Sequence, residues 1–442
     1  MRLLKSFLLL SALSFTTVSS HAQSPADWPP PRNVDPARSV SVGIRQITGK
    51  HLKLWTDVPS SAAVDELPQV FDAAVEQWAQ YFGVRPGLTV DWQVQAFLIR
   101  ERSKFEALGL LPVGHHDFLN GYALGNELWL DEQPSEYYLR HLLLHEGTHS
   151  FMLAFLGSAG PGWYMEGVAE LMGTHRWAED ELELNIFPAN RDEVPQWGRI
   201  KLIREANAAG SALSLGQVLS IDNRQALTTD AYAWTWALCK FLDSHPDYGK
   251  QFRKLSRLVQ RPDFNSRFRK LFHQEWDDLN VEWPAFVAAL DYGYDTERMA
   301  MEHSTASTVE DTASTTIQTD QGWQALPWLL KGGHQYQITA SGRYRIANDG
   351  QPWPCESGGV TIRYHEGEPL GILLGVLRPV KTRRDGSTDF AHPLVIGVEK
   401  TINVPFDAVL YLRVNDSPAE LSDNGGTIRV KIDRLESAVG GD

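Results

Sequence analysis

Residues 145–149 read His-Glu-Gly-Thr-His and lie inside a longer run, Glu136–Leu156, whose apolar residues fall on most sides of a helix. Ser135 can cap the start of this helix, and the Gly- and Pro-rich residues 157–162 end it. Histidines four residues apart lie on one face of a helix, so both imidazoles can share one metal ion. The glutamate between them can reach a water held by that metal and act as its general base. The run therefore predicts a buried helix that carries part of a metal site.

A site of this kind needs a third protein ligand, with the fourth position left open. Residues 163–170, Trp-Tyr-Met-Glu-Gly-Val-Ala-Glu, supply it. Glu166 follows His149 after sixteen intervening residues, enough for a Gly/Pro turn and a return helix packed antiparallel to the first. Glu170 lies one helical turn further, where a carboxylate can accept a hydrogen bond from the other ring nitrogen of a ligand histidine.

These two motifs together resemble the gluzincin metallopeptidases, the thermolysin and aminopeptidase clan. The resemblance is close over residues 136–173 and loose elsewhere in the first 300 residues, and the gap to the third ligand is shorter than in the aminopeptidases. It implies that Zn²⁺ is held by His145, His149 and Glu166, with Glu146 as the general base. It also implies an α+β fold in which a small sheet precedes the helices.

Two further roles follow from the same resemblance. Gluzincins place a tyrosine or histidine where it can donate to the oxyanion of the tetrahedral intermediate, and Tyr232 is the best-placed candidate. A core aromatic residue on a Trp-rich helix is an equally good interpretation of Tyr232. The edge strand of the gluzincin sheet binds extended peptide substrate, and Tyr122–Leu130 is the corresponding segment here.

Other histidines and the basic residues have simpler interpretations. His141 continues the row of His145 and His149, but it is better explained as a buried histidine with hydrogen-bond partners than as a ligand. His115 and His116 are adjacent, so their side chains point in different directions, and a loop pair is expected. Seven basic residues between Arg253 and Lys270 are interpreted as a solvated helix face rather than an anion site.

The start of the chain has the features of a signal peptide over residues 1–22. Arg2 and Lys5 precede a short apolar segment, and Ser20-His21-Ala22 is a small-x-small cleavage site. No other stretch approaches the ~20 apolar residues of a membrane helix. The mature chain is therefore expected to be exported, to the periplasm or the extracellular space, without a membrane span.

The net charge of the chain argues against one class of binding partner. The formal charge of −14 becomes −16 when the signal peptide, with Arg2 and Lys5, is removed, and this makes nucleic acid a poor partner. Fifteen tryptophans and 43% hydrophobic residues are ample for a large core. Cys239 and Cys355 are far apart and are expected to be unpaired.

The hydrophobic pattern predicts a first domain over residues 23–300, a linker over 301–312 and a second domain over 313–435, and the resemblance implies that the first domain is metallopeptidase-like. Helices are expected over Ala62–Phe82, Glu101–Leu108 and Asp230–Leu242 (capped by Thr229), and strands over His51–Thr56, Thr89–Ile99 and Tyr122–Leu130. The segment from Arg176 to about Met299 is expected to be mostly helical, with Leu182–Pro188 left open.

Beyond the linker, short alternating segments predict an antiparallel β-sandwich or barrel. The expected strands are Ser314–Thr319, Gln335–Ala340, Val360–Tyr364, Gly371–Leu377, Leu394–Val398, Val409–Val414 and Thr427–Ile432.

This part resembles the calcium-dependent galactose-binding bacterial lectins, through Ala-Ser-Gly-Arg-Tyr at 340–344 and an Asn-Asp…Asp-Asn-Gly-Gly element within 415–426. The resemblance implies a Ca²⁺ site formed by side chains of Asp416, Asp423 and Asn424 with the carbonyls of Glu420 and Ile346, and it implies a carbohydrate partner. A tight turn fixed by side-chain hydrogen bonds needs no metal and is the alternative. Trp-Pro at 353–354 stands where these lectins have a sugar-contacting His-Pro, which puts the sugar in question.

Three functions remain open at this stage. The first is a secreted zinc metallopeptidase that hydrolyses a peptide or protein substrate, with Glu146 accepting a proton and later returning it to the leaving amine. The second is a zinc hydrolase of the same scaffold that acts on a non-peptide substrate. The third is a carbohydrate-binding or adhesive protein whose peptidase-like domain is inactive. Retention of Glu146 favours the first two.

Overall fold

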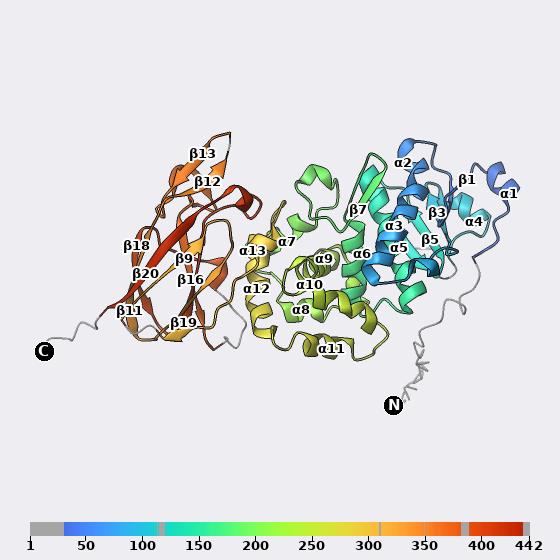
Figure 1. Ribbon diagram of the computed structural model, residues 1–442. Helices are drawn as coiled ribbons and strands as arrows, with labels where there is room; N and C mark the ends of the chain where they lie inside the picture. The colour runs from blue at the N-terminus through green and yellow to red at the C-terminus, as the bar shows by residue number, and fades with distance from the viewer. Residues whose placement is uncertain are drawn as a thin grey trace, which may run out of the picture.

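The computed structural model describes residues 31–112, 114, 120–308, 311–348, 350–381 and 389–435. A five-stranded sheet, a group of helices and a two-sheet unit follow one another along the chain, and Figure 1 shows them side by side in this order, blue to red. The protein is therefore of mixed α and β structure. The expected signal peptide (residues 1–22) and the His115–His116 pair lie outside the described residues.

The first sheet has the strand order β1-β2-β3-β5-β4. Strands β2, β3 and β5 run parallel, whereas β1 and β4 are antiparallel to their neighbours. Because β4 is the last strand in this order, it is an edge strand. The strands are β1 Arg45–Thr48, β2 Leu52–Thr56, β3 Val94–Ile99, β4 Gly121–Leu124 and β5 Glu127–Asp131.

Both faces of this sheet are covered, which explains why β3 is buried along its whole length. Successive side chains of a strand point to opposite faces. Leu98 and Leu130 accordingly pack into the large core that includes the helices α3 and α5, while Phe97 and Trp129 pack into a smaller core on the other face.

Helices form the rest of the first part of the chain. They are α1 Pro36–Ser41, α2 Ala62–Asp65, α3 Leu67–Phe82, α4 Arg102–Ala107, α5 Glu136–Leu156, α6 Gly162–Gly173, α7 Arg199–Ala208, α8 Leu215–Leu219, α9 Thr229–Ser244, α10 Gly249–Arg253, α11 Phe264–Leu271, α12 Trp276–Ala289 and α13 Thr296–Met299. A 3₁₀ helix, η5, occupies Lys254–Leu258 directly after α10.

The single strand expected over Tyr122–Leu130 is wrong, because this segment is the β4–β5 hairpin. Gly125 and Asn126 form its two-residue turn, and Gly125 has a positive φ of 62° that a glycine adopts without strain. The strand expected over Thr89–Ile99 starts only at Val94, because Thr89 and Trp92 are engaged in turn hydrogen bonds with Pro86 and Thr89.

Two helix predictions also change. The helix expected over Ala62–Phe82 is divided at Glu66, since Pro68 lies in the first turn of α3, where its missing N–H costs nothing. The expected helical segment after Arg176 begins instead with a hairpin, β6 His175–Ala178 and β7 Glu181–Leu184. Its turn, Glu179-Asp180, has positive φ at both residues, as the tight hairpin turn requires. The cap of α9 is Thr228 rather than Thr229.

The C-terminal part consists of two sheets that enclose one core, with the orders β17-β16-β19-β10-β8 and β18-β11-β20-β9. The pairs are antiparallel except for the short β8–β10 contact. The strands are β8 Ser307–Thr308, β9 Thr312–Gln318, β10 Gln324–Leu330, β11 His334–Ser341, β12 Tyr344–Asn348, β13 Pro352–Cys355, β14 Val360–His365, β15 Glu368–Leu370, β16 Leu373–Pro379, β17 Leu394–Val395, β18 Glu399–Val404, β19 Ala408–Val414 and β20 Thr427–Leu435.

A fourth apolar cluster joins the two parts. Val281 and Ala285 of α12 pack with Trp323, Phe390 and Tyr411 of the sandwich. Met301, in the segment expected to be a linker, belongs to the same cluster. The residues 301–308 therefore run through a packed contact between the two parts.

The loop between β19 and β20 adds a second contact. Leu421 is only 1% exposed and packs into the core of the first part of the chain. The carbonyl of Pro418 accepts a hydrogen bond from the Asp295 N–H at 3.0 Å, and Ala419 lies against Gly293. The sandwich is thus held to the helical part by buried side chains as well as by the chain itself. Among the described residues, no helix has the length and apolarity needed to cross a bilayer.

Candidate metal centre

The helix α5 is fixed at both ends and along one side. Ser135 caps it by accepting a hydrogen bond from the Tyr138 N–H at 3.0 Å, and Gly157 ends it with a left-handed φ of 74°. A Cβ atom at Gly147 would lie 2.7 Å from ring carbons of Phe71 and Trp78, so only glycine lets α3 approach this closely. This contact holds the helix that carries the histidines 145 and 149.

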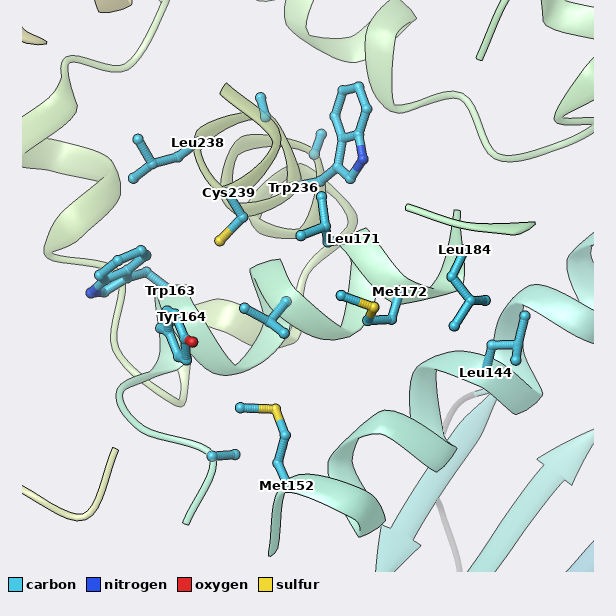
Figure 2. Close-up of a cluster of buried hydrophobic side chains, with 14 of the residues drawn as sticks. Leu144, Met152, Trp163, Tyr164, Leu171, Met172, Leu184, Trp236, Leu238 and Cys239 are labelled. Carbon is cyan, nitrogen blue, oxygen red and sulfur yellow. The ribbon is translucent and has the colours of Figure 1, made fainter. Parts of the chain in front are cut away.

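The helix α6 lies between α5 and α9, as Figure 2 shows through the packing of Trp163, Leu171, Met172 and Trp236. A Cβ atom at Gly167 would lie 2.6 Å from the Thr235 carbonyl oxygen of α9. Because Gly167 follows Glu166 directly, the close contact on one side of α6 fixes the position of the carboxylate.

Three side-chain atoms converge at the contact of α5 and α6. The Glu166 Oε2 atom lies 3.1 Å from His145 Nε2 and 3.3 Å from His149 Nε2, and the two Nε2 atoms lie 3.1 Å apart. The side chains of His145 and Glu166 are buried, and that of His149 is 12% exposed. Two imidazole nitrogens and a carboxylate oxygen in a triangle of this size could hold one metal ion. The three ligands expected from the sequence are therefore brought together.

Glu170 lies behind His145. Its Oε1 atom is 3.3 Å from His145 Nδ1, so a proton on Nδ1 points to the carboxylate and the lone pair of Nε2 points to the candidate metal position. Arg199 donates to both oxygens of Glu170, at 3.0 Å each. Although burial raises the pKa of Glu170, the Arg199 guanidinium lowers it well below its usual range.

A second group of ligand-type atoms, from His141, His145 and Glu170, lies beside the first. His141 Nδ1 is 2.8 Å from the Gly173 carbonyl oxygen, and its Nε2 is 3.4 Å from Glu170. Since the guanidinium of Arg199 already neutralises Glu170, a cation there would be repelled. The His141 ring is thus fixed by hydrogen bonds, and the first group is the better metal site.

Burial and neighbouring charges shift the pKa values of the candidate ligand residues in opposite directions. Burial lowers the pKa of His145, but hydrogen bonds to Glu166 and Glu170 raise it well above its usual value. Burial raises the pKa of Glu166, whereas the two histidines lower it to about 2. Glu166 is thus a carboxylate at neutral pH, as a metal ligand has to be. The Nδ1 atom of His149 is buried and has no hydrogen-bond partner in the described part of the chain.

Glu146 points toward the edge strand rather than into the ligand triangle. A Cβ atom at Gly121, the first residue of β4, would lie 2.6 Å from Glu146 Oε1, so β4 passes directly over this carboxylate. Glu146 is 8% exposed, and burial raises its pKa. The charges of His145 and His149 act on Glu146, and a buried carboxylate with a raised pKa beside a candidate metal position is suited to take up and return a proton.

Tyr232, in the first turn of α9, faces the same place. Its ring centroid lies 5.7 Å from that of His145, and the Arg199 guanidinium lies 5.6 Å from the ring. Burial raises the pKa of Tyr232, and the charges of Glu166 and Glu146 add to this, so the hydroxyl keeps its proton. Tyr232 is therefore at the site and can donate a hydrogen bond.

Two members of the site had no signal in the sequence analysis. Arg199 stands far along the chain from the histidines, after Gly198 with its left-handed φ of 64°. Gly121 lies at the start of a strand whose position beside Glu146 depends on the β4–β5 hairpin.

The calcium ligands expected in the sandwich lie in the loop that docks on the helical part. Asn424 Nδ2 donates to Asp416 Oδ2 at 2.8 Å. The Oδ1 atoms of Asp423 and Asn424 are buried without a hydrogen-bond partner among the described residues. Burial raises the pKa of Asp416 to about 6. Unpaired buried oxygens of this kind are the atoms that a hard cation would satisfy.

The remaining residues of this set have other contacts. The Glu420 side chain pairs with Arg363, which leaves its carbonyl as the candidate ligand atom. The Ile346 side chain is buried in the sandwich core. Arg345 donates to the carbonyl oxygens of Asp423 and Asn424, at 2.7 and 3.0 Å, so the loop backbone is held against β12.

Comparisons with known proteins add little. No protein family model and no curated protein matches the chain. One similar solved structure is described as the EclA N-terminal domain, a PllA-like lectin, with 22% identity, 28% of this chain and 95% of that chain covered, and a TM-score of 0.21. Another is Aeromonas hydrophila PliG, a periplasmic lysozyme inhibitor of g-type lysozyme, with 10% identity, 31% and 100% covered, and a TM-score of 0.17. Likenesses at these TM-scores carry no argument about this chain.

Proposed function

We propose that the protein is a zinc-dependent metallopeptidase. The observation that carries the proposal is the convergence of His145, His149 and Glu166 on one point, close enough to Glu146 for their charges to act on it. One nitrogen from each of two histidines and one carboxylate oxygen form a donor set that suits zinc. Ligand atoms about 2.0–2.1 Å from a tetrahedral zinc lie about 3.3 Å from one another, close to the separations observed here.

Bound zinc would supply a Lewis acid for water and for the scissile carbonyl. The side chains would do the rest. Glu146 would accept the proton of the attacking water and return it to the leaving amine. The hydroxyl of Tyr232 would donate to the oxygen that becomes negative. Glu170, held by Arg199, would keep His145 in the tautomer that offers its Nε2 lone pair.

The position of β4 favours a peptide over a non-peptide substrate. It is the edge strand of the sheet, it is antiparallel to β5, and Gly121 contacts Glu146. An extended peptide can add to a free strand edge by main-chain hydrogen bonds. Such a peptide would pass directly over the general base. The signal-like residues 1–22 further support an exported enzyme, periplasmic or extracellular.

The test begins with purified protein whose zinc content is measured by atomic absorption. The protein is then incubated with a mixed peptide library and, separately, with esters and other non-peptide substrates. One equivalent of zinc with cleavage of peptides supports the proposal. Zinc with hydrolysis of non-peptides alone would favour the second function class, and no hydrolysis by a zinc-loaded chain would favour a carbohydrate-binding or adhesive protein.

Tyr232→Phe is expected to lower kcat by about 10²–10³-fold if the hydroxyl donates to the oxyanion, because one such donor is worth this much. Zinc content and KM should change little, since the ring remains in place beside His145 and Arg199. Single-turnover kinetics on a cleaved library peptide measures the effect. A kcat within a factor of about two of the wild type would make Tyr232 a packed aromatic residue.

A second proposal concerns calcium in the loop between β19 and β20, on the strength of the unpaired buried oxygens of Asp423 and Asn424. Calcium that binds only the folded state stabilises it by about 2.7 kcal/mol at a hundred times its Kd. Calcium should therefore raise the melting temperature of metal-stripped protein, while magnesium at the same concentration should raise it less. The full chain is required, because Leu421 of this loop packs outside the sandwich.

Asp423→Ala is the variant for this measurement, and Asp311→Ala is its control, since Asp311 is an exposed aspartate elsewhere in the same unit. The calcium-dependent rise should disappear in the first variant and persist in the second. Identical melting curves with and without calcium in the wild type would mean that the loop is held by its own hydrogen bonds.

A further inference from the structure

The first residues of the basic run from Arg253 to Lys270, which was interpreted as a solvated helix face, line a pocket. A pocket of about 480 Å³ lies between the C-terminal end of α3 and the segment formed by α9, α10 and η5. Four cations line it: Lys250, Arg253, Lys254 and Arg257. Their spacing of three and four residues gathers them on one side of the helical segment. All four are exposed.

One of these four charges is already neutralised. Asp243, buried at the floor of the pocket, accepts from Arg253 Nε at 2.9 Å and from the Tyr81 hydroxyl at 3.0 Å. Its other oxygen accepts from Asn185 at 2.6 Å. The guanidinium of Arg253 also lies 5.7 Å from the Tyr81 ring. Arg253 is therefore oriented, and its charge is balanced, by groups of the pocket itself.

The other three charges are not balanced in this way. Within the described part of the chain, Lys250, Lys254 and Arg257 form no ion pair. Like charges at these helical spacings destabilise a helix, because their side chains lie next to one another. This local positive charge contrasts with the formal charge of the whole chain, which is −14. Three unpaired cations around one concavity in an acidic protein form a local field that attracts an anion.

We propose that this pocket binds a polyvalent anion whose charged groups are phosphate or sulfate. The three free cations would contact the anionic oxygens, and Arg253, held by Asp243, would present its remaining N–H groups at the wall. Asp243 lies about 16 Å along α9 from Tyr232, since the two are eleven helical steps of 1.5 Å apart. The pocket is thus a site apart from the metal centre, and its ligand does not have to be the hydrolysed molecule.

The test measures binding of tripolyphosphate to the full chain by isothermal titration calorimetry at low ionic strength. The pocket variant is the triple substitution Lys250→Gln, Lys254→Gln and Arg257→Gln. The control variant is Arg267→Gln, Arg269→Gln and Lys270→Gln, which removes the same charge from exposed positions on α11 outside the pocket. Zinc content of each variant reports that the fold and the metal centre are intact.

We expect the wild type and the control variant to bind tripolyphosphate alike, and the pocket variant to bind it ~10- to 100-fold more weakly, since three charge contacts are lost. A sulfated oligosaccharide and a carboxylate polymer of matched charge complete the series. Binding of the sulfated ligand in place of tripolyphosphate assigns the source as a sulfated glycan, and binding of tripolyphosphate assigns a phosphate-bearing one. Equal weakening in both triple variants, no heat with either ligand, or equal binding of the carboxylate polymer would overturn the proposal.

Discussion

Glu146→Gln is expected to lower the rate of peptide hydrolysis by ~10²–10⁴-fold, the usual worth of a general base, while zinc binding is unchanged. Glutamine has the size of glutamate and keeps a hydrogen-bonding group, but it cannot accept a proton at neutral pH. The Glu146 carboxylate contacts β4 and does not belong to the ligand triangle, so its loss leaves the three ligand atoms in place. Zinc content and kcat, measured on the same preparation, separate the two effects.

The matched control for this variant is Glu136→Gln. It makes the same substitution in the same helix, but Glu136 is exposed in the first turn of α5 and far from the histidines along the helix. Its rate should equal that of the wild type. If a zinc-loaded Glu146→Gln enzyme turned over at nearly the wild-type rate, another residue would be the base.

His149→Ala is expected to abolish both stoichiometric zinc and hydrolysis. The substitution removes one of the two histidine nitrogens that converge with Glu166 Oε2, and two ligands hold zinc far more weakly than three. The competing group of ligand-type atoms gives this experiment its second arm. His141→Ala removes a histidine of that group and leaves the first group complete.

Zinc content after dialysis against a weak chelator distinguishes the two groups. The site assigned here predicts about one equivalent in His141→Ala and none in His149→Ala. The reverse order, or one full equivalent retained in His149→Ala, would show that His149 is not a ligand. A circular dichroism spectrum of each variant excludes general unfolding as the cause of metal loss.

Much of the site could be predicted from the sequence because its chemistry is local. A spacing of four places His145 and His149 on one helix face wherever that helix lies in the fold. The return to Glu166 requires only a turn of the right length, which the Gly- and Pro-rich segment provides. The same reasoning reached Glu170, because one helical turn separates it from Glu166.

The partners that come from distant parts of the chain could not be predicted in this way. Arg199 reaches Glu170 only because α6 and α7 both pack against α9, and no periodicity encodes that arrangement. The strand expected over Tyr122–Leu130 was wrong because Gly125 allows a reversal of direction inside an otherwise continuous apolar pattern. The basic residues from Arg253 to Lys270 were interpreted as a solvated helix face, because the pocket that Arg253, Lys254 and Arg257 line depends on the end of α3 and not on their own spacing.

The contacts of Leu421 and Met301 determine how the sandwich could contribute to the proposed hydrolysis. A binding module on a flexible tether works by effective concentration, which changes with the length and stiffness of its linker. A module packed against the part that carries the candidate metal centre would instead hold any bound molecule at one fixed distance and orientation from that centre. Lengthening the segment that connects the two parts would then leave the position of the bound molecule unchanged. The distance from the candidate metal centre to a molecule held by the sandwich would therefore be fixed, and only ligands of matching length would reach both.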